Sequence, residues 1–352
     1  MTAMLLGLML CGHVHSQNIF KGGTGDGYAT AQVFQLPNMP GIFNGGGSDG
    51  NAVSMFEQPT AGPGIYNGGG ADGYASAQFD LPATAIGIFS GGAGDGWSSS
   101  EGSNVLVDLF CSALLEGPYA PGQQLMNDGL RSAGVLPLSE PYTALGYPQF
   151  AGGGGETTNT MLLAITGSTA IVDWVRLELR DATNPAIVVA TCQALVRRDG
   201  SIVNGSGSSL LRFGVPIGGS YYLVVRHRNH MGCMTAAPIL FSGVVPSIGF
   251  SGTSTVTYGT DARKVSGTAS LLRTGDVSGD HRLQYTGGGN DRDLILLKVG
   301  GTSPNNIAMG YWREDVNLDG IVKYTGTGND RDPILVNVGS TLPNSVRLEQ
   351  VP

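Results

Sequence analysis

The sequence predicts a mostly β protein in three parts: an N-terminal repeat array, a central β-sandwich-like domain and a small α-helical segment with two calcium loops. Three observations indicate this. Most of the 57 glycines stand in short clusters between apolar alternations, as in turn-rich β proteins. One motif recurs four times with a period of 23 residues, and an acidic motif occurs twice near the C-terminus.

The composition is that of a folded chain without the charge that nucleic-acid binding requires. Hydrophobic residues make up 41% of the 352 residues, which is enough to bury a core. The formal net charge is −8, and no basic run extends beyond pairs such as Arg197-Arg198, so we expect no nucleic-acid partner. An acidic surface suits solubility and divalent cations.

Residues 1–16 are predicted to be a signal peptide. The apolar stretch from Ala3 to Cys11 is too short to span a membrane. Val14 and Ser16 fit the small-residue positions of a signal-peptidase site before Gln17, although a positive n-region is absent. The alternative is a frayed apolar strand. No other run of 18 apolar residues occurs, so we expect a secreted or cell-surface protein whose mature chain has no transmembrane segment.

Three cysteines, Cys111, Cys192 and Cys233, would remain after cleavage. Their number is odd, and their spacing matches neither a CxxC motif nor a zinc site. In an exported protein one disulfide is feasible, and a Cys192–Cys233 bond would join two candidate strands. Buried free thiols are the alternative.

Residues 17–103 contain the four Gly-rich units, which start at Asn18, Gly41, Gly64 and Gly87. Each unit predicts a strand, a tight glycine turn and an alternating strand. Units this short cannot bury a face alone, so we expect them to stack into a β-solenoid or a sheet of hairpins. Each turn carries an aspartate that either caps its own turn or adds to a row of weak calcium sites: Asp26, Asp49, Asp72 and Asp95.

Residues 104–266 show separate strand signals with turns between them, which is typical of a β-sandwich. A long non-strand insertion follows Gly117. Glu116 and Glu140 are the only carboxylates that suggest a glycosidase pair, and nothing in the sequence sets their separation. Strand alternation places Arg226 and His227 on opposite faces, and His230 at the strand end is either a ligand or a hydrogen-bonded histidine.

Two acidic loops open the C-terminal segment. The second copy has oxygen-bearing side chains at alternating positions, followed by Gly320, as in the opening of an EF-hand loop. Calcium takes six to eight oxygens, and alternate side chains of a tight loop converge on one point. The candidate ligands are Asp315, Asn317, Asp319, the Ile321 carbonyl, Asp330 and Asp332 in this loop, and Asp276, Ser278, Asp280, the Arg282 carbonyl, Asp291 and Asp293 in the first.

Each loop is followed by an apolar run that predicts a short helix. The run after Asp293 ends in glycines, and the run after Asp332 begins with Pro333, which suits the first helical position. An EF-hand loop closes with an acid at position 12, whereas here the next acids come later.

Residues 274–340 resemble a dockerin type I-like tandem, with two calcium loops that each precede a short helix. The resemblance implies Ca²⁺ as cofactor and a cohesin-like partner. This tandem departs from the family pattern in three ways: six extra residues in each loop, His281 at a glycine position and Ser278 in place of Asn or Asp. The first site is therefore expected to be the weaker one.

The wider layout resembles large secreted bacterial surface proteins that carry such tandems. The stretches that carry the resemblance are Leu114–Tyr119, Glu140–Gly146, Val172–Asp181 and Tyr221–His230. The resemblance implies export and a surface or matrix setting, and it implies no reaction.

The sequence thus favours a secreted, non-catalytic, calcium-binding structural or adhesion protein that acts through protein or surface-glycan contacts. One alternative is a polysaccharide-degrading enzyme component with a dockerin-like module. Another is an assembly module that docks onto a cohesin-like partner. The expected domains are 17–103, 104–266 and 267–347. Chelation is expected to expose residues 274–340 to protease and to leave the sandwich intact.

Overall fold

The computed structural model describes residues 106–352 in full and the backbone of eight strands within residues 18–104. The chain divides into two units, Met1–Val105 and Leu106–Pro352. Strands outnumber helices in the described residues, so the prediction of a mostly β protein is confirmed. The expected signal peptide and the four turn aspartates of the repeats lie outside the described residues.

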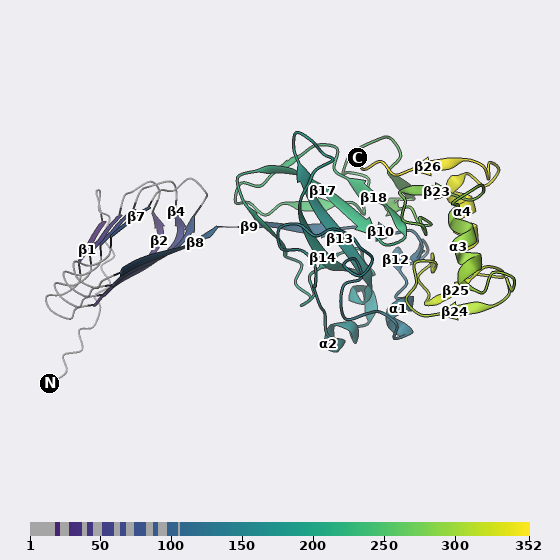
Figure 1. Ribbon diagram of the computed structural model, residues 1–352, viewed down its shortest axis with the longest axis horizontal. Helices are drawn as coiled ribbons and strands as arrows, with labels where there is room; N and C mark the ends of the chain where they lie inside the picture. Colours follow the sequence, from purple (N-terminus) through teal and green to yellow (C-terminus); the bar gives the residue numbers. More distant parts are fainter. Residues whose placement is uncertain are drawn as a thin grey trace. The chain divides into compact units, whose positions relative to one another are not determined.

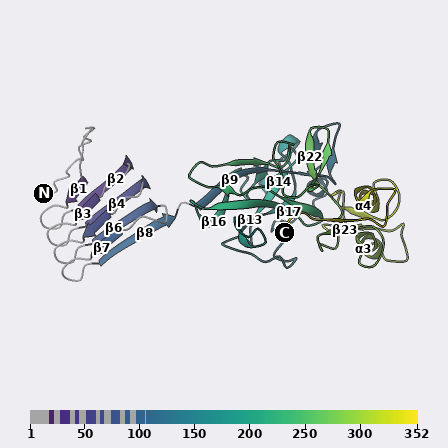
Figure 2. The same cartoon turned by 90° about the horizontal axis from the view of Figure 1, so that it is seen from above.

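The repeats of the first unit contribute one strand each to two parallel sheets (Figure 2). Equivalent residues pair in register, so that Ile19 lies opposite Ile42 and Ile42 opposite Ile65. The described strands of one repeat thus belong to different sheets and do not form a hairpin. One sheet contains β1 (Asn18–Lys21), β3 (Gly41–Asn44), β5 (Gly64–Asn67) and β7 (Gly87–Ser90). The other contains β2 (Tyr28–Leu36), β4 (Asn51–Pro59), β6 (Tyr74–Leu81) and β8 (Trp97–Asn104).

The second unit is built on a large antiparallel sheet and two smaller sheets (Figure 1). The large sheet consists of β15 (Ile202–Val203), β14 (Val188–Arg197), β13 (Ile171–Asp181), β17 (Ser220–His227), β18 (His230–Met234) and β19 (Ile239–Leu240). The second sheet consists of β16 (Leu211–Pro216), β9 (Leu106–Ser112) and β20 (Ser247–Gly249). The third consists of β10 (Leu114–Leu115), β22 (Ala269–Leu272) and β21 (Arg263–Ser266).

These sheets share one hydrophobic core. Leu109 and Phe213 from the second sheet and Leu195 from the large sheet are fully buried in the same cluster. The core continues past the expected domain end at residue 266, because Leu272 of β22 and Leu318 of the second acidic loop belong to it as well. The strands of residues 106–266 and the segment with the two acidic loops therefore form one unit rather than two.

The long insertion after Gly117 covers the central strand β13. The insertion holds β11 (Tyr119–Ala120), β12 (Leu125–Met126) and α1 (Gly129–Ser132); α2 (Thr160–Leu163) and a 3-10 turn (Gly167–Thr169) follow. The indole of Trp174 donates to the Pro137 carbonyl at 2.9 Å, and the Tyr142 hydroxyl donates to the Trp174 carbonyl at 3.0 Å. This cover explains why β13 is buried along nearly its whole length.

The C-terminal segment contains two short helices and four short strands. They are β23 (Arg282–Gln284), α3 (Asp291–Lys298), β24 (Ile307–Met309), β25 (Ile321–Lys323), α4 (Arg331–Val338) and β26 (Val346–Leu348). β24 pairs with β25, and β23 pairs with β26. Figure 1 shows these two pairs at opposite ends of the helices. A second hydrophobic cluster, which includes Val277, Leu283, Ile295, Val322 and Ile334, holds the segment together.

α3 begins three residues earlier than the sequence predicted, and α4 begins two residues earlier. α3 starts at Asp291 and α4 at Arg331, so Pro333 is the third helical residue and not the first. The reason is that Asn290 and Asn329 act as caps, because their side-chain carbonyls accept the N–H groups three residues on, at 3.0 and 2.9 Å.

The three cysteines of the second unit are buried and free, so of the two alternatives the structure has the free thiols and not the Cys192–Cys233 disulfide. Cys192 lies opposite Leu177, Leu177 opposite Val225, and Val225 opposite Cys233. The two cysteines are thus three strand spacings apart in one row of the large sheet, about 14 Å at the usual inter-strand distance. A disulfide needs Cα atoms within roughly 7 Å.

Candidate metal centre

The opening half of the second acidic loop is held by its own side chains. The buried carboxylate of Asp315 accepts N–H groups from Asp319 at 3.1 Å and Gly320 at 2.8 Å. Asn317 accepts from the N–H of Asp319 at 2.9 Å, and Asp319 accepts from that of Ile321 at 2.8 Å. These bonds turn the three side chains toward one tight loop, in which Gly320 has a φ of 85°.

Asp330 closes this loop from the C-terminal side. One of its oxygens accepts the Val316 N–H at 2.7 Å, and the other accepts the Lys323 N–H at 2.7 Å. Asp330 is fully buried and therefore ties the start of the loop to β25. Ile321, whose carbonyl is a candidate ligand, is the first residue of that strand.

The first loop repeats this arrangement 39 residues earlier. Asp276 accepts from Gly279 at 2.8 Å and from His281 at 3.3 Å. Asp291 accepts from Ser278 and from Gln284, both at 2.9 Å. Arg282, the other carbonyl candidate, opens β23, and its N–H donates to Asp280 at 3.0 Å.

The first loop is the more open of the two. Asp280 is exposed, whereas its equivalent Asp319 is half-buried. Each loop holds one residue with a Cβ at positive φ, His281 at 65° in the first and Leu318 at 60° in the second, so backbone strain does not distinguish them. The exposure of Asp280 agrees with the expectation of a weaker first site.

Four aspartates of the two loops are buried, and the charges of Arg228 near Asp315 and His281 near Asp276 do not offset that burial. Burial raises the pKa of Asp276 to about 6, of Asp291 to about 7 and of Asp315 to about 6. Burial, and then the nearby Asp315, raise the pKa of Asp330 to about 8. Within residues 106–352 no Lys, Arg or His side chain forms an ion pair with any of the four. A buried carboxylate pair of this kind is stabilised by a bound cation.

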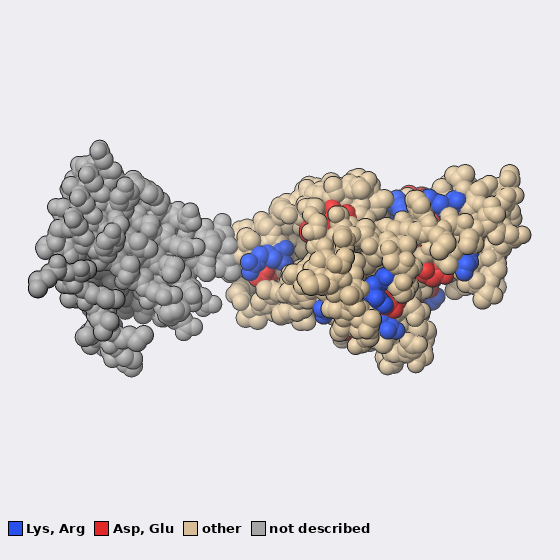
Figure 3. Space-filling model, turned by 90° about the horizontal axis from the view of Figure 1, so that it is seen from below, with Lys and Arg blue, Asp and Glu red and all other residues tan. Residues whose placement is uncertain are grey.

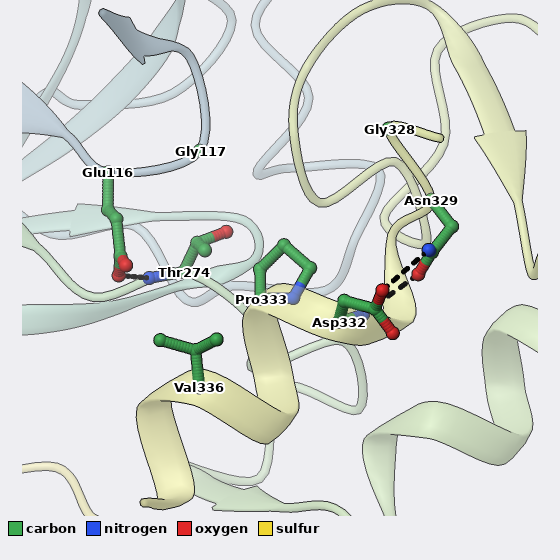
Figure 4. Close-up of a pocket in the computed structure, with 8 residues that line it drawn as sticks. All are labelled: Glu116, Gly117, Thr274, Gly328, Asn329, Asp332, Pro333 and Val336. Carbon is green, nitrogen blue, oxygen red and sulfur yellow. Dashed lines mark hydrogen bonds between the residues drawn. The ribbon is translucent and has the colours of Figure 1, made fainter. Parts of the chain in front are cut away.

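The other two predicted closing ligands lie elsewhere. Asp293 and Asp332 are both 56% exposed at the side chain. Each forms a reciprocal pair with its capping asparagine, since Asn290 and Asn329 donate to them at 2.8 Å (Figure 4). The structure therefore brings Asp291 and Asp330 to the loops and uses Asp293 and Asp332 to start the helices.

The donor set of each loop fits a hard cation. Each loop presents two buried carboxylates, one more exposed carboxylate, and a hydroxyl or amide side chain, and all of these groups offer oxygen. Oxygen ligands are those that Ca²⁺ prefers, whereas Zn²⁺ prefers nitrogen and sulfur. In the described part of the chain no three His, Cys, Asp or Glu side chains converge. The set would thus rely on two aspartates per loop, completed by Asn317 or Ser278 and by main-chain carbonyls.

The second loop docks directly against the sandwich, which sequence reasoning missed. Leu318 is 1% exposed and belongs to the main core, although its φ is 60°. A Cβ on Gly129 would stand 2.6 Å from the Leu318 carbonyl oxygen, and one on Gly320 would stand 3.2 Å from Ala133. The only signal in the sequence was the choice of glycine at these positions.

The turn between β17 and β18 lies between the two acidic loops. The Asn229 amide donates to the carbonyls of Arg313 at 2.8 Å and Asp315 at 2.7 Å. The backbone carbonyl of Asn229 accepts the Gly275 N–H at 2.9 Å. Residues 275 and 315 lie at the start of the first and second loops, so this one side chain and its backbone join both loops to the large sheet.

His230 is hydrogen-bonded on both ring nitrogens. Its Nε2 accepts the Gly117 N–H at 3.2 Å, so its proton lies on Nδ1, which faces Nδ1 of His227 at 2.9 Å. His227 then donates from Nε2 to Asp173 at 3.0 Å. The donor and acceptor assignments of these ring nitrogens follow from the hydrogen bonds around them. Burial lowers the pKa of His227 and lowers that of His230 well below its usual range. The hydrogen-bonded interpretation of His230 is therefore the one the structure shows.

Asp173 is where this chain of bonds meets the C-terminal segment. It is fully buried and accepts from the Tyr311 hydroxyl at 2.6 Å and from Arg228 Nε at 3.2 Å. The Arg228 guanidinium also lies 4.2 Å from the Tyr311 ring centroid and donates to the Trp312 carbonyl. The conformation of residues 311–312 is thus specified by groups on β13 and the β17–β18 turn.

A second buried charge cluster surrounds Glu178 on β13. It pairs with Arg176 at 2.9 Å, Arg180 at 2.8 Å and Arg226 at 3.3 Å. Burial alone would raise the pKa of Glu178, but the three arginines outweigh it and lower the pKa to about 2. Arg226 also pairs with Glu349 of the C-terminal tail. As expected from strand alternation, Arg226 and His227 have separate partners.

Glu116 and Glu140 have structural hydrogen bonds and share no partner. Glu140 accepts the N–H groups of Tyr142 at 2.7 Å and Gly155 at 3.0 Å. Glu116 pairs with Lys264 and accepts from Thr274 at 3.1 Å. Figure 4 shows a groove of about 380 Å³ beside Glu116; its lining residues are Glu116, Gly117, Thr274, Gly328, Asn329, Asp332, Pro333 and Val336. Glu140 is not among them.

On the face shown in Figure 3, acidic and basic side chains of the second unit lie beside one another. None of the helices described is long and apolar enough to cross a membrane. No family model, curated protein or solved structure matches the chain.

Proposed function

We propose that the two acidic loops bind Ca²⁺ as a structural cofactor in an exported, non-catalytic structural or adhesion protein that acts through protein or glycan contacts. The observation that carries the proposal is the set of four buried aspartates, which accept main-chain N–H groups from their own loops and form no ion pair with a Lys, Arg or His side chain within residues 106–352.

A bound cation would neutralise these carboxylates and hold each loop closed. Asp315 and Asp330, completed by Asn317 and main-chain carbonyls, would hold it in the second loop. Asp276 and Asp291, completed by Ser278 and main-chain carbonyls, would hold it in the first. Because the ligands must be deprotonated, binding would compete with protons for the aspartates of raised pKa.

The other buried or half-buried acidic side chains already have hydrogen-bond or ion-pair partners, which supports a non-catalytic role. Glu116, Glu140, Asp173 and Glu178 all accept bonds that shape the backbone or pair with buried arginines. A polysaccharide-degrading enzyme remains the rival, and it requires two facing carboxylates that these contacts do not supply. A cohesin-like partner would have to bind beside a second loop that already packs on its own sandwich.

Calcium titration of the chelator-treated full chain tests the proposal. Ca²⁺ at a hundred times its Kd should raise the free energy of unfolding by about 2.7 kcal/mol per site. Asp330→Asn should remove one of two sites in calorimetry. Asp332→Asn is the matched control, because that side chain pairs with the capping Asn329 at the start of α4, and it should keep both sites. A wild-type chain that takes up no Ca²⁺ at millimolar concentration would refute the proposal.

The adhesion part needs a separate experiment. The calcium-loaded full chain should bind a surface glycan or a matrix protein on an array, and chelation should weaken that binding. Release of reducing sugar from a polysaccharide substrate, lost in Glu116→Gln, would instead favour the enzyme.

A further inference from the structure

Each acidic loop is completed by a strand from the other repeat. β24 follows the first helix and pairs with β25 of the second loop, with Met309 opposite Ile321. β26 follows the second helix and pairs with β23 of the first loop, with Leu348 opposite Arg282. Residues 39 positions apart thus occupy equivalent places in the two acidic repeats, each of which consists of a loop, a helix and the strand that follows it. The strand that ends each acidic repeat pairs with the loop of the other, so the two acidic repeats exchange their closing strands.

A pair of equivalent hydroxyl contacts fastens the exchange. Thr325, which follows β25, donates to the Pro304 carbonyl at 3.1 Å and contacts the Asn305 side chain at 2.8 Å. Thr286, which follows β23, makes the same contacts with the Pro343 carbonyl at 3.1 Å and the Asn344 side chain at 2.6 Å. Neither threonine is a candidate ligand, yet each holds one repeat's loop to the other repeat's strand.

The two repeats differ where they meet the sandwich. Leu318 of the second loop lies in the main core, whereas its equivalent in the first loop is Gly279, against which the Arg313 guanidinium lies. Asn337 of α4 donates to Glu116 at 2.6 Å and to the Thr274 carbonyl at 2.9 Å. Its equivalent in α3, Lys298, instead lies 3.5 Å from the Trp312 ring centroid.

Besides the bond from Gly275 to Asn229 at its start, the first loop reaches the sandwich through the tail that follows β26. The Glu349 N–H donates to the His281 carbonyl at 2.9 Å, and the Glu349 carboxylate accepts the Gly232 N–H at 2.6 Å. The same carboxylate pairs with Arg226. The first loop therefore depends on the position of β26, which depends in turn on α4 and the second loop.

We propose that the two loops form one coupled cation-binding unit, in which the second site is joined to the sandwich core and the first site is joined to it through the exchanged strands. The inference rests on the proposed calcium binding. Cation binding at either loop orders the strand pairing that the other loop requires. Because coupling is reciprocal, each site strengthens the other by the same factor, within the roughly 5- to 150-fold range of such effects.

The first experiment is a calcium titration of the chelator-treated full chain by calorimetry. In Asp315→Asn the remaining first site should bind at least fivefold more weakly than in wild type, and in Asp276→Asn the remaining second site should weaken by the same factor. Thr286→Val with Thr325→Val should keep two sites and lose most of the coupling. Thr302→Val, an exposed threonine without a side-chain hydrogen bond among the described residues, is the control and should behave as wild type.

Hydrogen exchange of the same proteins tests the asymmetry. Asp315→Asn should speed amide exchange in residues 114–135, which pack on the second loop, and Asp276→Asn should leave those amides protected. A remaining site that weakens less than fivefold in either aspartate variant would overturn this inference while the proposed function stands. A wild-type chain that binds no calcium would overturn the proposed function and the inference with it.

Discussion

Gly117 lies directly against the backbone of Val316, so closely that a Cβ at position 117 would collide with the Val316 carbonyl oxygen and stand 3.2 Å from the Cα of Asn317. The Gly117 N–H also donates to His230, and the Val316 carbonyl accepts from the Thr274 hydroxyl at 2.8 Å, so each backbone segment is held in place by a hydrogen bond of its own. This glycine sets how closely the long insertion approaches the second acidic loop.

Gly117→Ala should therefore lower the free energy of unfolding by about 1–3 kcal/mol, because one backbone segment must move. It should also weaken calcium binding at the second loop, since Asn317 shifts with Val316. Urea denaturation and calcium titration measure the two effects. Gly122→Ala is the control, because a Cβ there has no neighbour within 4 Å, and it should change neither quantity. Equal behaviour of the two variants would contradict the close contact.

Leu318→Ala should lower the free energy of unfolding by about 2–5 kcal/mol, the usual loss for a large-to-small change in a core. The loss is expected because Leu318 belongs to the main hydrophobic cluster, although it lies within a polar loop. Leu297→Ala on α3, where the side chain is 69% exposed, should stay within about 0.5 kcal/mol of wild type. If both variants cost the same in urea denaturation, the loop is not anchored in the core.

The buried histidine pair should make the protein less stable in mild acid. The pKa values of His227 and His230 are lowered in the folded state by burial, so the unfolded chain binds more protons. Stability should then be present above the unfolded pKa of about 6.5 and should fall as pH drops from about 7 toward 5. The groups that face the pair are Asp173, Arg228, Asn229 and the Gly117 N–H.

Urea midpoints at several pH values, in excess calcium so that the loop carboxylates stay occupied, measure this effect. His230→Gln removes one titrating ring and should flatten the profile between pH 5 and 7. A profile as steep in the variant as in wild type would assign the acid sensitivity to other groups.

Glu178→Gln should lower the free energy of unfolding by about 3–5 kcal/mol, because it leaves buried arginines without their counter-charge. The folded pKa of Glu178 is about 2, so its contribution is present above the unfolded pKa and is lost as pH falls through the range from about 4.5 to 2. Asp108→Asn is the control, since its partner Arg212 is 62% exposed, and it should cost no more than about 1 kcal/mol. Thermal unfolding at pH 7 and pH 3 compares them, and a loss in Glu178→Gln no larger than the control's would contradict a tightly balanced cluster.

Several features of the second unit followed from local pattern. Apolar alternation placed the strands of the large sheet, and the apolar runs after Asp293 and Asp332 indicated the two helices, although the capping role of Asn290 and Asn329 moved their starts. The helix starts were missed because Asn and Asp cap equally well, so sequence alone does not say which of them is the cap.

The sequence by itself determined the strand-rich composition, the 23-residue period and the identical spacing of oxygen-bearing residues in the two acidic loops. These are local properties, since they depend on alternation, on turn residues and on spacing. Only the tertiary structure decided that Leu318 enters the sandwich core and that the two acidic repeats exchange β24 and β26. It also decided that Cys192 and Cys233 are three strand spacings apart. Such contacts join residues up to two hundred positions apart, and no local period or propensity specifies which distant backbone will lie against Gly117.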